Sequence, residues 1–273
     1  MSREIVIEPG GGHRRYWRDL WEFRELFVFL AWRDISVRYK QTIIGVAWSI
    51  LQPVVTMIVF TIVFGRLAAL PSGGVPYPLL VFSAVLPWQF FATSLTASSD
   101  SLVSNRDMIS KIYFPRLALP SSAIIVHLVD MLIAFGVLLA LMVFYQIWPT
   151  WRFVALVPLT GLAAAFALGS GLWFAALNVR YRDFRYLVPF MIQLGIYVSP
   201  VGFSSDIVPD NLRFIYSLNP MVGVIDGFRW AILGQDAPLY VPGFVLSILL
   251  VAIIFASGLR HFRGTERSFA DVI

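Results

Sequence analysis

Residues 43–64 read IIGVAWSILQPVVTMIVFTIVF and contain no Asp, Glu, Lys or Arg. An α-helix rises about 1.5 Å per residue and the hydrocarbon core of a bilayer is about 30 Å thick, so about 20 apolar residues suffice to cross it. Residues 43–64 therefore predict a membrane-spanning helix. Five further stretches along the chain meet the same criterion. The six predicted spans are approximately residues 43–64, 78–99, 117–145, 153–177, 186–203 and 239–259.

The composition of the 273-residue chain agrees with these spans. Hydrophobic residues make up 58% of the chain, charged residues 14%, and the mean hydropathy is +0.76. Such values are typical of integral membrane proteins rather than of soluble domains. Because cysteine is absent, the chain can form neither disulfides nor a thiolate metal site. The predicted fold class is an all-α integral membrane protein with six transmembrane helices.

Two segments outside these spans have other patterns. In residues 16–40, apolar side chains recur at helical spacing opposite charged ones, which predicts an N-terminal amphipathic interface helix that serves as an anchor or as a lever beside a cytoplasmic partner. Residues 212–234 are apolar but interrupted by Asn, Pro, Gly, Asp and Arg, which predicts a re-entrant or interfacial segment of two short helices between spans five and six. The predicted domains are a cytoplasmic segment at 1–41, a six-span domain at 42–260 and a cytoplasmic tail at 261–273.

Lysines and arginines predict the orientation. Eight precede the first span, and the second connection, the fourth connection and the tail hold three each, whereas the other three connections hold the remaining four. Cytoplasmic loops carry such an excess of basic residues, so both termini are predicted to be cytoplasmic. The net charge of +5 then reflects topology rather than nucleic-acid binding.

Several kinds of chemistry lack their residues. The two lysines, Lys40 and Lys111, do not follow a glycine, which excludes the phosphate-binding loop of P-loop ATPases. The histidines lie in three separate regions without metal-ligand spacing. An enzymatic site, a metal site and a bound cofactor are therefore not expected on this chain.

One ionisable pair lies inside a predicted span. His127 and Asp130 are three residues apart, hence on one helical face, and Asp130 is expected near the middle of the bilayer. The pair would act as a proton relay, face a substrate path, or form a local polar contact against a neighbouring helix. No basic residue on another span stands out as a partner for Asp130.

Four stretches resemble one protein family. They are RYKQTIIGVAWSILQPV (38–54), SKIYFPRLALP (110–120), NVRYRDFRYLVPF (178–190) and LNPMVGVIDGFRWAILG (218–234). Together they resemble the permease subunits of ABC-2 type polysaccharide exporters, most of all the O-antigen exporter permeases of the Wzm type, with the teichoic acid exporter permeases as cousins. The resemblance runs in order from about Leu20 to Leu259.

The resemblance implies a function and partners. The chain would be the passive permease of an ATP-driven exporter in the bacterial inner membrane. Two copies would pair with two ATP-binding cassette subunits, which would bind ATP and Mg. The substrate would be a polyprenyl-pyrophosphate-linked polysaccharide resembling O-antigen. Alternatives are an exporter of capsule or teichoic acid, an ion-coupled flippase for lipid-linked saccharides, and a membrane enzyme acting on lipid-linked sugars.

The resemblance also assigns candidate residues. The second cytoplasmic connection would form a coupling helix that docks into the ATPase, unless it is an ordinary positively charged loop; its residues are Asn105, Arg106, Asp107, Met108, Ile109, Lys111, Ile112, Tyr113 and Phe114. The next cytoplasmic turn would set topology, or contact the ATPase or the substrate's pyrophosphate, through Arg180, Arg182, Asp183 and Arg185.

Aromatic side chains would stack on sugars along the path. The candidates are Trp48, Phe60, Trp88, Phe90, Phe91, Trp173, Phe174, Tyr197 and Phe203, although aromatic side chains in membrane proteins also serve packing and interfacial belts. In the interrupted segment, Asn219, Asp226 and Arg229 would line an outer vestibule or satisfy backbone groups.

Overall fold

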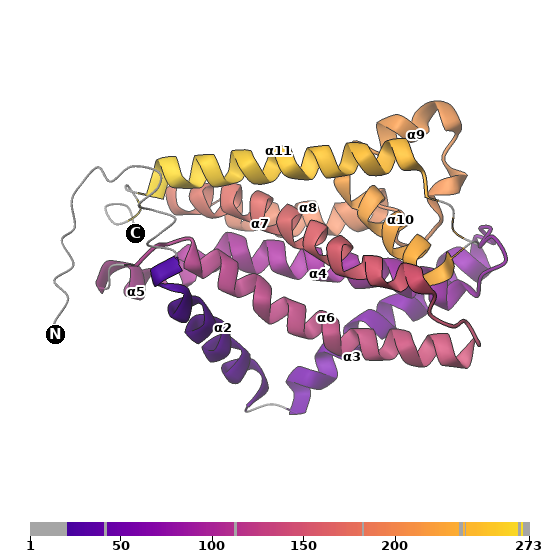
Figure 1. Cartoon of the computed structure of the whole chain (residues 1–273), viewed down its shortest axis with the longest axis horizontal. Coiled ribbons are helices and arrows are strands. Elements are labelled where there is room, and N and C mark those ends of the chain that lie inside the picture. Colours follow the sequence, from indigo (N-terminus) through magenta and orange to yellow (C-terminus); the bar gives the residue numbers. More distant parts are fainter. Residues whose placement is uncertain are drawn as a thin grey trace.

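The computed structural model describes residues 21–40, 43–111, 114–181, 183–234, 237, 239–266 and 269, and no β-strand occurs among them. Long helices lie side by side along one axis (Figure 1). The helices in chain order are α2 (Arg24–Tyr39), α3 (Ile43–Phe60) continued by the π-helix η1 (Thr61–Leu67), α4 (Tyr77–Ser104), α5 (Arg106–Lys111), α6 (Ala118–Phe144), the 3-10 helix η2 (Trp151–Ala155), α7 (Leu156–Arg180), α8 (Phe184–Val198), the 3-10 helix η3 (Ser205–Ile207), α9 (Asp210–Tyr216), α10 (Pro220–Leu233) and α11 (Val241–Thr265).

Among the described residues, five helical stretches are long and apolar enough to cross a membrane. They are Val46–Leu67, Tyr77–Ser104, Ala118–Phe144, Trp151–Arg180 and Val241–Thr265, which correspond to the first four and the last of the predicted spans.

The predicted fifth span, residues 186–203, is wrong in its helical extent. The helix there, α8, is apolar but ends at Val198, after 15 residues. Ser199 has extended backbone, because Pro200 clashes with a helical conformation of the residue before it. At about 1.5 Å per residue, α8 is shorter than the hydrocarbon core is thick. A total of six spans therefore stays a prediction.

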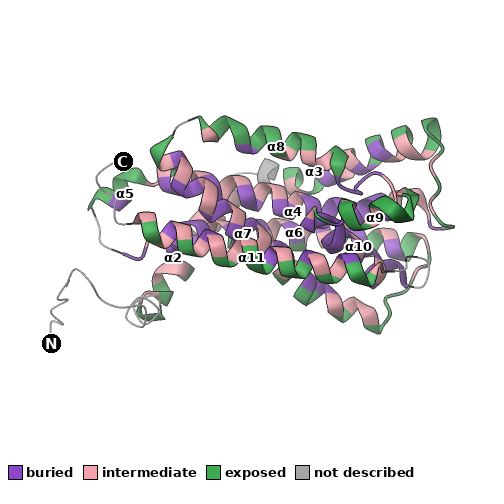
Figure 2. Cartoon of the chain, turned by 90° about the horizontal axis from the view of Figure 1, so that it is seen from above, coloured by how far each residue is buried: buried purple, intermediate pink, exposed green. Residues whose placement is uncertain are grey.

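Helix α4 is the centre of the bundle. Of its 28 residues, 18 are buried, and it packs against α3, α6, α7 and α10. Figure 2 shows buried residues concentrated on α4, α7 and α10, whereas α8 is largely exposed. The buried residues of α4 include serines as well as apolar side chains, so its burial reflects its place among the other helices rather than its hydropathy.

A second, smaller core joins six helices, α2, α4, α5, α6, α7 and α11, at one end of the bundle. It contains Leu30 of α2, Leu102 of α4, Ile109 of α5, Leu172 of α7 and Phe262 of α11, all buried. This end, which holds α5, the start of α2 and the end of α11, is called the α5 end, and the opposite one the α9 end (Figure 1). The small core fixes α2 and α5 to the long helices.

The interrupted segment forms two helices, α9 and α10, separated by residues 217–219. In α10, 12 of the 14 residues are buried. It packs against α4, α7 and α11, and small residues permit the close approach: a methyl group added to Gly223 would lie 2.6 Å from Cβ of Ser247 on α11. The two-helix form agrees with the sequence prediction, while the placement of the segment relative to a bilayer stays a prediction.

Helix α2 turns only a small part of its apolar surface inward. Leu30 and Ala31 are buried, and the helix packs on α6. Trp21, Val28 and Trp32 of the predicted apolar face are exposed, at 68–71%. Exposed tryptophans are typical of helices that lie in the headgroup layer of a membrane. The role of α2 as an interface helix nevertheless stays a prediction. The part of residues 16–40 before Trp21 lies outside the described residues.

Candidate functional site

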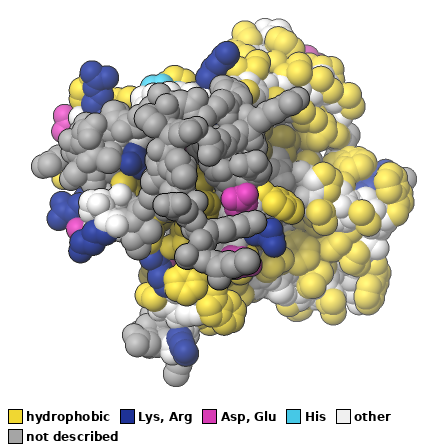
Figure 3. All heavy atoms as spheres, turned by 60° about the vertical axis from the view of Figure 1, so that its left-hand side comes forward, with side chains coloured by type: hydrophobic (Ala, Val, Ile, Leu, Met, Phe, Trp, Pro, Cys, Tyr) yellow, Lys and Arg dark blue, Asp and Glu magenta, His cyan; other side chains and the backbone are white. Residues whose placement is uncertain are grey.

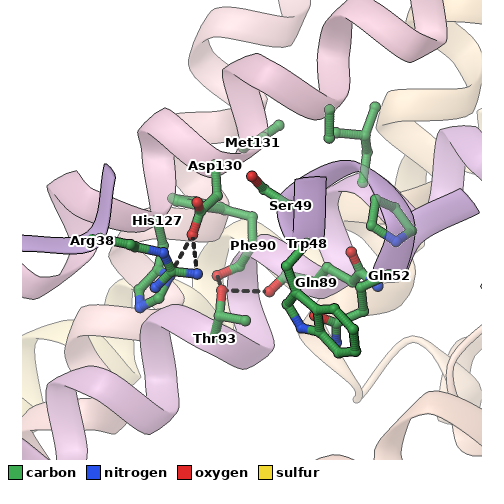
Figure 4. Close-up of a pocket in the computed structure, with 13 residues that line it drawn as sticks. Arg38, Trp48, Ser49, Gln52, Gln89, Phe90, Thr93, His127, Asp130 and Met131 are labelled. Carbon is green, nitrogen blue, oxygen red and sulfur yellow. Dashed lines mark hydrogen bonds and ion pairs between the residues drawn. The ribbon is translucent and has the colours of Figure 1, made fainter. Parts of the chain in front are cut away.

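A small cavity, partly open at the surface beside Trp48 and Gln52, lies where α2, α3, α4 and α6 meet. Its volume is about 40 Å³, and its polar lining comes from Arg38 of α2, Ser49 and Gln52 of α3, Gln89 and Thr93 of α4, and His127 and Asp130 of α6. Figure 4 shows Arg38 and His127 pointing at Asp130, with Trp48, Phe90 and Met131 around the cavity. A polar cavity among apolar helices marks this place as a candidate functional site.

Asp130 is the centre of the polar contacts at this cavity. Its carboxylate lies 3.1 Å from Nδ1 of His127 and 2.8 Å from Nη2 of Arg38, and its other oxygen accepts a hydrogen bond from the Tyr39 hydroxyl. The Asp130 side chain is 15% exposed. Burial and the hydrogen bond to Asp130 raise the pKa of Tyr39 to about 12. The negative charge of the Asp130 carboxylate is therefore balanced by Arg38, and both of its oxygens have hydrogen-bonding partners.

The sequence predicted the contact of Asp130 with His127, and the structure confirms it. It did not predict the partners on α2: the expectation concerned a basic partner on another span, whereas the basic partner, Arg38, lies on α2, outside the spans. Arg38 and Tyr39 lie about 90 residues earlier in the chain, with the hydroxyl contact separated by 91 positions. Helical periodicity within α6 carries no information on such a distant contact.

A larger crevice continues from the cavity toward the α5 end. It has a volume of about 380 Å³, lies between α2, α4 and α6, and shares Arg38 and His127 with the cavity. Its other polar residues are Asp34, Asp100, Ser101, Ser104, Asn105 and Ser122. At its rim, Nη2 of Arg33 lies 3.3 Å from the Asn105 side-chain oxygen. A polar route thus leads from the α5 end into the bundle.

Sequence reasoning missed the polar residues of α4 that line this route. Gln89, Thr93, Asp100 and Ser101 lie on a helix that is otherwise apolar. Several of the hydroxyl groups also donate to backbone carbonyls of the same helix, as Thr93 does to Gln89 at 2.8 Å. The signal in the sequence was the run TSLTASSDSLVSN at 93–105, which is unusually rich in hydroxyl groups for a span.

The three predicted vestibule residues make contacts within the chain. Asn219 caps α10 by accepting from the Met221 N–H at 3.1 Å and donates to the Ser199 hydroxyl at 2.9 Å. Asp226 accepts from the Ser205 hydroxyl at 2.7 Å.

Arg229 is 3% exposed, and its guanidinium lies 3.3 Å from the carbonyl oxygen of Leu80 and 3.4 Å from that of Val201. These contacts fit the alternative in which the polar residues satisfy backbone groups. Contact with a sugar stays a prediction.

The cap on α10 gives a testable expectation. Asn219→Ala removes an acceptor from the first turn of a buried helix, and we expect the stability of the protein to fall by about 1 kcal/mol. Asn219→Ser retains a side-chain oxygen and is expected to recover most of the loss. Thermal unfolding of the two variants in detergent measures the difference, and equal midpoints would contradict it.

The nine predicted path aromatics fall into separate groups. Phe60, Trp88, Phe90 and Phe91 are buried, and Phe91 stacks on Phe166 at 4.5 Å. Trp48 and Tyr197 are exposed, at 55% and 62%. The others are half-buried and lie against neighbouring rings: Trp173 on His261, Phe174 near Phe184, and Phe203 near Phe64.

Comparison with known proteins shows the family of the chain. A family model described as ABC-2 type transporter matches residues 25–233. The chain belongs to the ABC-2 type transporter family. This confirms the resemblance that the four sequence stretches suggested.

Individual relatives match between 79% and 94% of this chain. The O-antigen export system permease protein RfbA of Myxococcus xanthus is 26% identical over 259 residues, which cover 94% of this chain and 98% of the relative. An RfbA protein of Klebsiella pneumoniae is 29% identical over 256 residues, covering 91% and 95%. The inner membrane transport permease YadH of Escherichia coli K12 is 26% identical over 234 residues, covering 79% and 89%.

In this ABC-2 transporter chain, the predicted coupling element is a short helix, α5, at the end of the bundle. Arg106, Asp107 and Lys111 are exposed, Met108 is half-buried and Ile109 is buried. Phe114 is buried as well, so two of the apolar residues expected to enter a partner's pocket pack into the small core of the chain itself. Ile112 and Tyr113 lie outside the described residues, and docking of the element stays a prediction.

The second basic turn of the transporter also lies at the α5 end. Arg180, Asp183 and Arg185 are exposed, and the Arg180 guanidinium lies 5.4 Å from the centre of the Tyr181 ring. Arg182 lies outside the described residues. Figure 3 shows lysine and arginine side chains gathered toward this end, while the flank of the bundle is hydrophobic.

Proposed function

We propose that this chain is the membrane permease of an ATP-driven exporter that moves a polyprenyl-linked, O-antigen-like polysaccharide from the cytoplasm across the bacterial inner membrane. The observation that carries the proposal is the likeness to O-antigen export permeases along more than 90% of both chains, together with the family match. The polar crevice at the α5 end supports it, because a hydrated substrate needs polar side chains on its way into the bundle.

The energy for export comes from separate ATP-binding subunits. The sequence has no phosphate-binding loop for ATP, so ATP and Mg bind to the partner, and this chain is a transport subunit without enzymatic activity. The partner docks at the α5 end, where α5 offers exposed basic and acidic side chains to it. The basic residues gathered there make this end cytoplasmic by the positive-inside rule, and both termini are on that side.

Two copies of the chain form the transporter, with α3 and α8 of each facing the other copy. The amide side chains of Gln52 on α3 and Gln193 on α8 are exposed on these helices, and an unpaired amide facing lipid costs several kcal/mol. The faces meet near the α9 end, where the rings of Phe60 and Tyr197 are 6.5 Å apart. Trp48 and Tyr197, exposed on the same two helices, are available to stack on sugars.

A charge-reversal experiment tests the proposal. The permease is co-expressed with the ATP-binding subunit of its transporter, and both the co-purified ATPase and the surface polysaccharide are measured. We expect Arg106→Glu with Lys111→Glu to weaken the association about tenfold and to reduce export, because charges at an interface steer partners. Arg66→Glu is the matched control, since Arg66 is exposed in η1 near the opposite end.

The wild-type protein gives the decisive outcome of that experiment. A permease that is stable without an ATPase, binds none and moves the lipid-linked saccharide under a proton gradient would overturn the proposal. Equal loss of ATPase in the Arg66 control would instead show a general effect of charge on assembly and would contradict docking at α5.

A further inference from the structure

The end of α11 is tied to the connection that follows α5. The backbone N–H of Arg116 donates to a side-chain oxygen of Glu266 at 2.9 Å, and the Arg116 guanidinium donates to the backbone carbonyl of the same residue. Glu266 is the C-cap of α11. A cation at the C-terminus of a helix interacts favourably with its free carbonyl groups and its dipole, so Arg116 is well matched to this position.

Beyond α11, Phe269 inserts into the small core. Its side chain is 1% exposed, and its ring meets that of Phe262 edge to face at 5.4 Å. The Arg116 guanidinium lies 5.9 Å from the centre of the same ring. The cluster that surrounds Phe269 also contains Ile109 of α5 and Phe114, which follows α5. The tail of the chain thus packs in the same core as the inner side of α5.

Two kinds of contact hold α5 in place: apolar packing in the small core, and hydrogen bonds made by Arg116 in the connection after it. The helix has six residues, too few for an isolated helix to be stable in water, so its position depends on Ile109, on Phe114 and on what they pack against. Arg116, Glu266 and Phe269, here called the tail clamp, fix the residues directly after it. A force applied to the exposed side of α5 therefore passes into α11 through the tail clamp as well as into α6 through the chain.

We propose that the tail clamp positions α5 so that movements of the ATPase are transmitted to the long helices. This inference rests on the proposed function, in which α5 docks to the ATPase. Arg116, Glu266 and Phe269 are positioning residues: in the chain they hold α5, and contact with the substrate is not part of their role. Loosening the clamp uncouples ATP hydrolysis from export while the two subunits stay associated.

The position of α5 can be measured on the permease alone. The chain contains no cysteine, so Ser110→Cys, on the exposed side of α5, accepts a single nitroxide spin label in the full-length protein. Phe269→Ala and Arg116→Gln are expected to increase the mobility of the label severalfold. Phe269→Leu retains an apolar side chain and is expected to restore most of the order. Phe144→Ala, which alters an aromatic ring that is 76% exposed at the other end of the bundle, is the control.

The same variants are then tested in the complete complex with the ATPase. We expect Phe269→Ala to retain the bound ATPase and its ATP hydrolysis and to lose most of the export per ATP, with rescue by Phe269→Leu. Unchanged label mobility in the Phe269→Ala protein would overturn the inference. Unchanged export per ATP would overturn it as well, and so would a loss of export that only follows a smaller amount of assembled complex. A wild-type permease that binds no ATPase would overturn the proposed function and the coupling role with it, whereas the spin-label result would still report the contact.

Discussion

Gly258→Ala is expected to prevent the native packing of α7 against α11. A methyl group on Gly258 would overlap the backbone carbonyl of Gly169, with its carbon only 3.0 Å from the carbonyl carbon. In the reverse direction, a methyl group on Gly169 would lie 2.6 Å from Cα of Phe255. Both obstacles are backbone atoms of long helices, so a rotamer change cannot relieve them. We expect a loss of at least about 3 kcal/mol, at the upper end for overpacking.

The same two helices supply matched controls for this prediction. Gly264 on α11 and Gly161 on α7 have no heavy atom within 4 Å of an added methyl group. Gly264→Ala and Gly161→Ala are therefore expected to be neutral or slightly stabilising, because Ala favours helix more than Gly does. Thermal unfolding and size-exclusion profiles in detergent compare the three variants. A Gly258→Ala protein that melts with its Gly264→Ala control would contradict the close crossing of α7 and α11.

The contrast among these glycines illustrates what the sequence could predict of the fold. Glycine in a span favours close helix packing in general, but Gly161 and Gly169 lie in the same predicted span, 153–177, and differ entirely in their surroundings. The spans themselves were predictable because apolar length is a local property. The early end of α8 was also encoded locally, by Pro200 after Ser199, and a span defined by apolar content alone overlooked it.

The candidate site was predictable to a smaller degree, for a related physical reason. His127 and Asp130 belong to one helix, so their contact follows from the helical repeat. The contacts of Asp130 with Arg38 and Tyr39 depend on how α2 lies against α6. That arrangement rests on two buried residues of α2, Ala31 and Leu30, of which Leu30 belongs to the small core. Likewise Ile109 and Phe114 are apolar residues in a charged connection, and only the packed chain shows that they face inward.

Asp130→Ala is expected to release the C-terminal end of α2 from α6. The substitution removes the carboxylate that contacts Arg38, Tyr39 and His127 together. Breaking a buried ion pair by removing one partner costs about 3–5 kcal/mol, and because the Arg38 side chain is 36% exposed and can turn toward water, we expect about 2 kcal/mol here. Asp130→Asn retains the shape and an acceptor for Tyr39, so it should lose less stability. Thermal unfolding measures both.

A double-mutant cycle distinguishes the contact from independent effects of its members. If Arg38 and Asp130 stabilise the protein through each other, then Arg38→Gln with Asp130→Asn should cost less than the sum of the single variants, by about 0.5–3 kcal/mol. Additive losses would contradict the ion pair. Export then decides between structural and functional roles: a structural pair predicts that Asp130→Asn protein still exports when it is expressed and assembled normally. Loss of export from such a protein would mean that the Asp130 carboxylate takes part in transport itself, because its shape is preserved and only its charge is removed.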